Sequence, residues 1–98
     1  MSTPFAFVAR LEAKPEKAES LAALLTGALP LAEAEPGTVA WYAAQTSPTT
    51  FWIFDTFASE EARQAHIKGE IAAALMANAE DLLAAPPEIL PADVLAAK

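Results

Sequence analysis

The sequence predicts an α+β domain in which four antiparallel strands form one sheet and helices cover a single face of it. Patterns typical of strand, helix, strand, strand, helix and strand follow one another along the chain. A length of 98 residues suits one domain with one modest core, so we expect residues 1–98 to form a single domain. The order of elements is that of a ferredoxin-like four-stranded antiparallel sheet with its helices on one side.

The first half of the chain predicts two strands separated by a helix. Residues 5–13 are rich in Phe and Val and alternate between two faces. Pro15 suits the first turn of a helix, and Pro30 should kink that helix because its ring clashes with the preceding turn. The sequence Glu-Pro-Gly at 35–37 indicates a turn, and residues 38–45 predict the second strand. Apolar residues recur at helical spacing between the strands, at Ala18, Leu21, Leu24, Leu25, Ala28 and Ala32.

A hairpin and a capped helix follow. Residues 46–50 form a polar loop between the second strand and a third strand over 51–57. Ser59 is placed as an N-cap, with two acidic residues in the first turn after it. This short helix should run to about Lys68, since Gly69 permits a break.

The C-terminal third predicts a second helix and an edge strand. A stripe of Ile71, Leu75, Ala79 and Leu82 indicates a helix over 70–84, and the two prolines that follow end it. Residues 88–96 predict the last strand. Pro91 confines this strand to an edge or a bulge, because proline has no N–H for a central ladder.

Charge and composition exclude several classes of function. The net charge is −7 and the six basic residues are scattered, which disfavours nucleic acid and anionic membranes. With no cysteine and one histidine, we expect neither thiol chemistry nor a metal site. The longest nearly apolar stretch, residues 21–32, is shorter than the ~20 residues that span a bilayer. No secretion signal is visible, so we expect a cytoplasmic protein.

The distribution of aromatic residues predicts a homodimer. In the second and third strands, aromatic residues occur at both odd and even positions, so they point to both faces of the sheet. The helices can cover only one of these faces. A bare face carrying these side chains would be an apolar patch of several hundred Å². We therefore expect two sheets to pack face to face.

Two segments carry a resemblance to a known family. They are EPGTVAWY at 35–42 and FWIFDTFASEEARQAH at 51–66, followed by an apolar helix and a terminal strand. This pattern resembles the antibiotic biosynthesis monooxygenase (ABM) family of the dimeric α+β barrel superfamily, over nearly the whole chain. Its most specific part is an acid, an aromatic, a helix start and a histidine, here Asp55, Phe57, Ser59 and His66. The family usually carries Glu, and often Trp, at the first two of these positions.

The resemblance implies a reaction without a metal, haem or flavin cofactor. In such monooxygenases an electron-rich phenol, a quinol or an anthrone, supplies the electrons to O₂ itself. A related branch of the superfamily degrades haem through a histidine on the second helical segment and an asparagine on the first strand. This chain has Ile71 to Ala77 in that helical region and no asparagine before Asn78, which disfavours haem degradation.

His66 and Asp55 are the candidate catalytic residues. His66 shares a helix face with alanine and glycine, so it should point inward, either as a core histidine tied to Asp55 or a carbonyl or as a pocket acid–base group. Asp55 lies between Ile53 and Phe57 on its strand face and needs a partner, His66 or Arg63, because an unpaired buried carboxylate is costly. We predict that Asp55 and His66 approach within hydrogen-bond reach, directly or through one water, and that the carboxylate raises the histidine pKa.

Three readings of function follow. The first is a cofactor-independent monooxygenase for a small aromatic quinol or anthrone, with a pocket between the sheet and the second helix. The second is a non-enzymatic domain on the same scaffold that binds a small ligand or mediates assembly, and a third is an isomerase of muconolactone type, which has less support in the residues. A cavity of a few hundred Å³ touching His66 would favour the first reading, and a collapsed interior the second. The predicted substrate-binding residues are Phe51, Ile53, Phe57 and Leu75.

Overall fold

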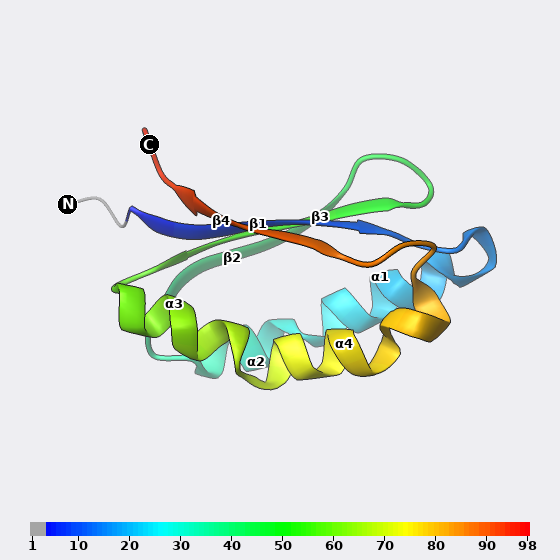
Figure 1. The fold of residues 1–98 in the computed structure, drawn as a ribbon, viewed down its shortest axis with the longest axis horizontal. Coiled ribbons are helices and arrows are strands. Elements are labelled where there is room, and N and C mark those ends of the chain that lie inside the picture. Colours follow the sequence, from blue (N-terminus) through cyan, green and yellow to red (C-terminus); the bar gives the residue numbers. More distant parts are fainter. Residues whose placement is uncertain (1–3) are drawn as a thin grey trace.

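The computed structural model describes residues 4–98, and these form one antiparallel sheet backed by helices on one side (Figure 1). The strand order is β2-β3-β1-β4, the ferredoxin-like order that the sequence predicts. No helix among the described residues is long and apolar enough to cross a membrane. The elements are β1 (Phe5–Glu12), the 3₁₀ helix η1 (Pro15–Lys17), α1 (Ala18–Gly27), α2 (Leu29–Ala34), β2 (Thr38–Gln45), β3 (Thr50–Phe57), α3 (Glu60–Ile67), α4 (Glu70–Leu82) and β4 (Glu88–Asp93).

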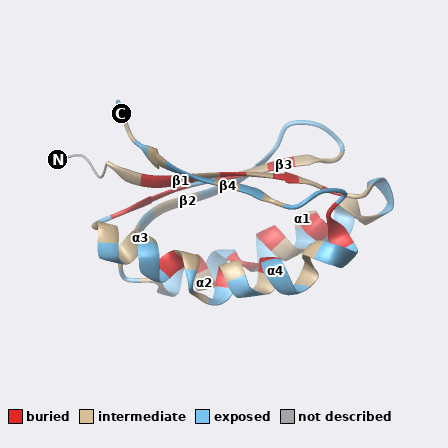
Figure 2. Ribbon diagram, in the orientation of Figure 1, coloured by how far each residue is buried: buried red, intermediate tan, exposed pale blue. Residues whose placement is uncertain are grey.

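Alternation along the strands decides which side chains meet the helices. In β3, Ile53 and Asp55 lie on the helix side, opposite Ala9 and Phe7 of β1 in the register. The buried residues concentrate between sheet and helices, where Figure 2 shows red on the inner sides of both layers. The main apolar core consists of Ala9, Leu11, Ala13, Leu21, Leu25, Phe51, Ile53, Leu75, Leu82 and Leu83.

The helix boundaries follow the local signals in the sequence. The helical segment breaks at Ala28, between α1 and α2, and Pro30 lies in the first turn of α2, where its missing N–H is no loss. The hydroxyl of Ser59 accepts a hydrogen bond from the backbone N–H of Ala62 and so caps α3. The chain then breaks at Lys68 and Gly69 before α4 begins.

The predicted helix over 70–84 and the predicted strand over 88–96 both extend beyond the ends that the structure shows. Helix α4 ends at Leu82 instead of residue 84, because Leu83 pairs with Ala13 in an isolated bridge and Ala84 N–H donates to the Glu12 carbonyl. Strand β4 ends at Asp93 instead of residue 96, three residues short of the prediction. As predicted, the strand with Pro91 lies at an edge of the sheet, where it pairs only with β1.

The face of the sheet away from the helices is open and partly apolar. Tyr42, Phe54 and Leu90 are large hydrophobic residues that remain exposed there. Phe54 pairs with Tyr42 on one side and Val8 on the other, and Val8 in turn pairs with Leu90, so the four side chains form one row across the sheet. The row is the apolar face on which the prediction of a dimer depends.

Candidate functional site

Asp55 is a buried carboxylate on the helix side of β3. The residue is only 1% exposed, and its Oδ2 atom lies 2.9 Å from Nε2 of His66. Within residues 4–98, no group donates a hydrogen bond to the other oxygen, Oδ1. The predicted contact between Asp55 and His66 is confirmed, and it leaves one carboxylate oxygen free to accept a proton or a hydrogen bond.

His66 lies between two carboxylates. Its Nε2 contacts Asp55, and its Nδ1 lies 2.7 Å from Oε1 of Glu35. Ser59 fixes where α3 starts, and the two turns that follow place the imidazole over β3. The ring packs against Phe57 with 5.0 Å between centroids. Two ionised carboxylates accept hydrogen bonds only, so this geometry favours an imidazolium that donates from both nitrogens.

Opposing effects act on the pKa of His66. Burial by itself lowers the pKa, because it disfavours the charged ring. The hydrogen bonds to Asp55 and Glu35, together with their negative charges, raise it, and the net result is a pKa above the ordinary 6.5. The upward direction of the pKa shift agrees with the prediction made from Asp55 alone, and Glu35 adds to it.

Glu35 is the residue of the site that sequence analysis missed. Glu35 is the C-cap of α2 and the first residue of the Glu-Pro-Gly turn, which lies against α3. The turn can approach so closely because residue 37 is glycine: a Cβ there would lie 2.4 Å from the Cβ of Ala62. Thr38 Oγ1 donates a 2.6 Å hydrogen bond to the same Oε1 that contacts His66. The only signal in the sequence was the EPG segment, which indicated a turn and no more.

A small apolar cavity adjoins Asp55 and His66 between the sheet and helices α3 and α4. Its volume is about 30 Å³, room for roughly two water molecules, well below the few hundred Å³ expected. Apart from Asp55 and His66 its lining is apolar. The remaining lining residues are Phe7, Ala9, Ile53, Ile67, Ile71, Ala72, Leu75 and Ile89.

Two of the four predicted substrate-binding residues line this cavity and two do not. Ile53 and Leu75 lie at it, as predicted. Phe51 is two residues farther along β3 and lines a separate hollow beside α1. Phe57 is fully buried between Phe7 and His66, with a T-shaped contact of 5.8 Å to Phe7, so it supports the histidine from behind the cavity.

Arg63 does not take part in the carboxylate pair. Its guanidinium donates to the carbonyls of Ala6 and Ala92, pairs with Glu60, and lies over the ring of Phe7. Of the two partners proposed for Asp55, the structure therefore provides His66. Within residues 4–98, no three His, Cys, Asp or Glu side chains are arranged to hold a metal ion.

A family model matches most of the chain. The sequence model described as antibiotic biosynthesis monooxygenase matches residues 4–78, which include Glu35, Asp55 and His66. No curated protein matches the sequence.

Solved structures resemble the chain over nearly its whole length. A protein of unknown function from Nitrosomonas europaea is 56% identical, with a TM-score of 0.94, and the match covers 98% of this chain and 93% of that one. A protein from Pseudomonas aeruginosa is 26% identical, with a TM-score of 0.83 and 98% coverage of both chains. The crystal structure of an antibiotic biosynthesis monooxygenase is 16% identical, with a TM-score of 0.81 and coverage of 94% and 99%, and shares the fold.

Proposed function

Since the chain belongs to the antibiotic biosynthesis monooxygenase family, we propose that it is a cofactor-independent monooxygenase for a small quinol- or anthrone-like phenol. The observation that carries the proposal is Asp55. Its Oδ1 atom has no donor within the described residues, its Oδ2 atom is held by His66, and the residue lines an apolar cavity. A buried carboxylate that lines an apolar site and keeps one oxygen without a partner is suited to accept a phenolic proton.

We assign different roles to Asp55 and His66. Both imidazole nitrogens already contact carboxylates, so neither is free to take the proton of a substrate in the cavity. Asp55 Oδ1 is therefore the proton acceptor. His66 fixes the orientation of the carboxylate through the contact between its Nε2 atom and Oδ2.

The reaction balances with O₂ as the only oxidant. The phenolic O–H bond breaks and its proton binds Asp55. The phenolate passes an electron to O₂, and the resulting radical pair forms a C–O bond at a ring carbon that carries hydrogen. The peroxide takes the proton back from Asp55, and its O–O bond breaks as water leaves with that carbon's hydrogen. One oxygen atom ends as a carbonyl and the other as water, and the substrate supplies all the electrons.

The size of the cavity requires the protein to open for an aromatic ligand. About 30 Å³ accommodates no ring, whereas ligand sites usually measure ~300–1,000 Å³. The lining residues that can move apart are those of α4, such as Ile71 and Leu75, against Ile53 of the sheet. The small volume on the Asp55 side favours the second function, a non-enzymatic domain that binds a small ligand or mediates assembly. A hollow of about 440 Å³ on the Glu35 side of His66 has the size expected for the first function.

Oxygen uptake separates the two functions. We expect the protein to consume O₂ with at least one member of a panel of quinols and anthrones, without added metal or flavin. Asp55→Asn removes the acceptor and should lower the rate ~10²–10⁴-fold. Phenols that bind and quench tryptophan fluorescence but never consume O₂ would instead establish ligand binding as the function.

We also propose that two copies pack through the open faces of their sheets. Members of the family commonly form dimers. The row of Tyr42, Phe54, Val8 and Leu90 offers the apolar surface for this contact. The cavity lies on the other side of the sheet, so dimerisation leaves its approach from α4 unobstructed.

A further inference from the structure

His66 separates two hollows of different character. On its Asp55 side is the small apolar cavity of about 30 Å³. On its Glu35 side is a surface groove of about 440 Å³ between the turn after α2 and helix α3. Glu35, Thr38 and His66 line this groove together with Glu61 and Glu70. The imidazole is therefore the only side chain shared by the two linings.

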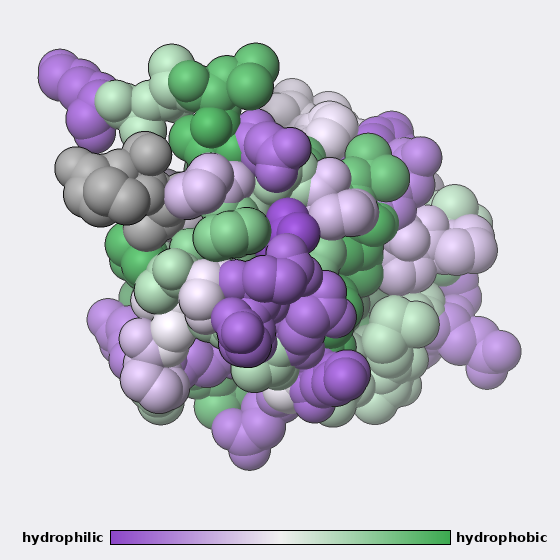
Figure 3. Space-filling model, turned by 60° about the vertical axis from the view of Figure 1, so that its left-hand side comes forward, coloured by the Kyte–Doolittle hydropathy of each residue, from purple (hydrophilic) through white to green (hydrophobic). Residues whose placement is uncertain are grey.

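The groove belongs to the polar end of the molecule. In Figure 3, which brings the left-hand end of Figure 1 forward, hydrophilic residues gather across the middle of the face. Helix α3 lies at this end and exposes Glu61 and Gln64, and Lys68, directly after the helix, is exposed too. Glu35 retains 22% side-chain exposure, whereas Asp55 has 2%, so the carboxylates on the two sides of His66 differ in their access to water.

We propose that Asp55, His66 and Glu35 form a proton relay that connects the cavity to the groove, with Glu35 as its solvent-side end. The inference deepens the proposed function and rests on it for the identity of the proton donor, a phenol. The contacts of 2.9 Å and 2.7 Å on opposite nitrogens of one ring are within hydrogen-bond distance at both steps. The imidazole can release the proton on Nδ1 to Glu35 while its Nε2–H continues to donate to Asp55.

The transfer conserves charge within the three groups. At rest Asp55 and Glu35 are anionic and His66 is cationic, a total of −1. A phenolic proton binds Oδ1 of Asp55, and the proton on Nδ1 of His66 passes to Oε1 of Glu35 and on to water in the groove. Asp55 and His66 are then neutral and Glu35 is anionic again, which restores −1. When the peroxide takes its proton from Asp55, His66 regains one through Glu35.

The charges around His66 favour the protonated ring between turnovers. From β3 it faces Asp55 and the apolar ring of Phe57, and from the turn after α2 it faces Glu35. Arg63, on the same helix, is directed to Glu60 and to the sheet edge. The groove adds the negative charges of Glu61 and Glu70. Anionic groups thus predominate around the ring, and they keep a proton available on it between turnovers.

The chain is suited to a direct test, because His66 is its only histidine and its ring resonances need no assignment by mutation. The test compares the wild type, Glu35→Gln and the control Glu33→Gln in ¹⁵N-histidine-labelled protein. Glu33 is exposed, lies two residues from Glu35 and loses the same charge. We expect exchange of the Nδ1 proton with water to slow by about 10²-fold in Glu35→Gln, and to stay at the wild-type rate in the control.

Turnover supplies the second measurement. With a quinol that the wild type oxidises, Glu35→Gln should lower kcat and shift its pH profile, while KM changes little, since Glu35 lies outside the cavity. Glu35→Asp keeps the carboxylate but shortens it by one methylene, and both exchange and turnover should recover part of the way. This variant also serves if Glu35→Gln yields too little folded protein.

The outcomes distinguish the relay from the function it serves. Wild-type exchange and wild-type kcat in Glu35→Gln would overturn the relay and leave the monooxygenase proposal standing. If no quinol or anthrone supports O₂ uptake by the wild type, the monooxygenase proposal fails, and the exchange measurement still decides whether protons pass through Glu35. Slower exchange with a loss of kcat in Glu35→Gln, and neither effect in Glu33→Gln, supports both.

Discussion

On the helix-covered face of the sheet a carboxylate and an imidazole lie beneath apolar side chains, whereas on the opposite face aromatic and aliphatic side chains are exposed. Asp55 and His66 are buried on the first face, and Tyr42 and Leu90 are exposed on the second. Both arrangements run against the usual distribution of residue types. Polar groups remain buried where a partner holds them, and apolar groups remain exposed where another surface can cover them.

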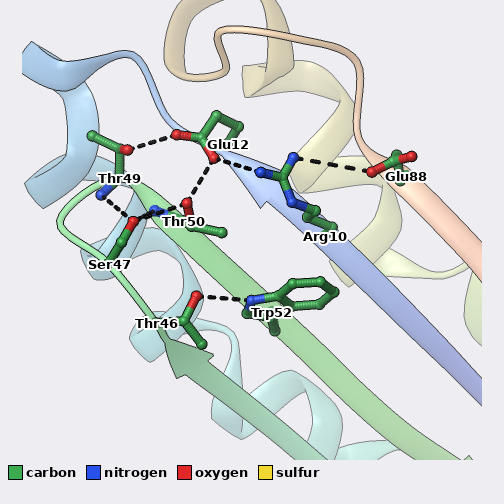
Figure 4. Close-up of polar contacts among 8 residues, drawn as sticks. All are labelled: Arg10, Glu12, Thr46, Ser47, Thr49, Thr50, Trp52 and Glu88. Atoms are coloured by element: carbon green, nitrogen blue, oxygen red, sulfur yellow. Dashed lines mark hydrogen bonds and ion pairs between the residues drawn. The ribbon is translucent and has the colours of Figure 1, made fainter.

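The open face also has a polar cluster, and it differs from the buried one in its access to solvent. Figure 4 shows Glu12 accepting hydrogen bonds from Thr49 and Thr50, at 2.6 and 2.7 Å, beside an ion pair of 3.1 Å with Arg10. The hydrogen bonds from Thr49 and Thr50 lower the pKa of Glu12 most; burial opposes them with a smaller effect, and the charge of Arg10 lowers the pKa least. Glu12 keeps 27% side-chain exposure, so water screens these contacts.

The largest effect should come from breaking the buried pair. His66→Leu leaves Asp55 buried and without its partner, which typically costs roughly 3–5 kcal/mol of unfolding free energy. Urea denaturation followed by tryptophan fluorescence, at a fixed protein concentration, measures the loss. Asp55→Leu combined with His66→Leu is the control, because replacing both partners should recover most of the stability. A double variant as unstable as His66→Leu would mean that packing, and not the unpaired charge, causes the loss.

A charge placed on the open face should separate the two copies. Tyr42→Asp puts a carboxylate into the apolar row, and central aromatic residues of interfaces typically contribute about 2 kcal/mol or more. Sedimentation velocity should show a dimer for the wild type and a monomer for the variant, with the helix content unchanged by circular dichroism. A wild type that sediments as a monomer at every concentration would refute pairing through this face.

The two polar clusters should respond to opposite ends of the pH range. The folded-state pKa of His66 lies above 6.5, so its contribution to stability is complete below that pH and is lost as the pH rises through the raised pKa. The folded-state pKa of Glu12 lies below 4.5, so its contribution is present above that pH and is lost as the pH falls through the lowered pKa. Urea midpoints between pH 3 and 9 should decline at both ends. His66→Gln should flatten the alkaline side alone.

The smallest effect should come from neutralising the exposed cluster. Glu12→Gln keeps the shape of the side chain and one of its two acceptor oxygens, and water screens the contacts that the substitution removes. Unfolding at pH 7 should therefore differ little from the wild type. A loss of unfolding free energy as large as that of His66→Leu would show that Glu12 contributes as much to stability as the buried pair.

Part of the candidate site follows from local patterns. Alternation along β3 places Asp55 on the same face as Ile53, and the Ser59 cap fixes the start of the helix that carries His66. Both are short-range arguments across eleven residues, so their agreement with the structure is a consequence of regular geometry. The alternation correctly identified the face of Phe51 but gave no information about its distance from His66.

The remainder depends on tertiary contacts. Glu35 and His66 are 31 residues apart, and they meet because Gly37 packs against Ala62. No periodicity in either segment specifies that approach. The volume of the cavity is likewise set by how closely α4 packs on the sheet, which depends on the side chains of three elements together and on no single pattern.

The close approach of Gly37 to Ala62 has a consequence for how the sequence can vary. Because an added methyl at position 37 would lie 2.4 Å from that of residue 62, the two positions accept changes only in a particular order. Ala62→Gly first makes room, and Gly37→Ala can follow, whereas the reverse order displaces the turn and withdraws Glu35 from His66. The effect of Gly37→Ala thus depends on which residue stands at position 62, which is epistasis between two small residues. Its consequence reaches a third residue, Glu35.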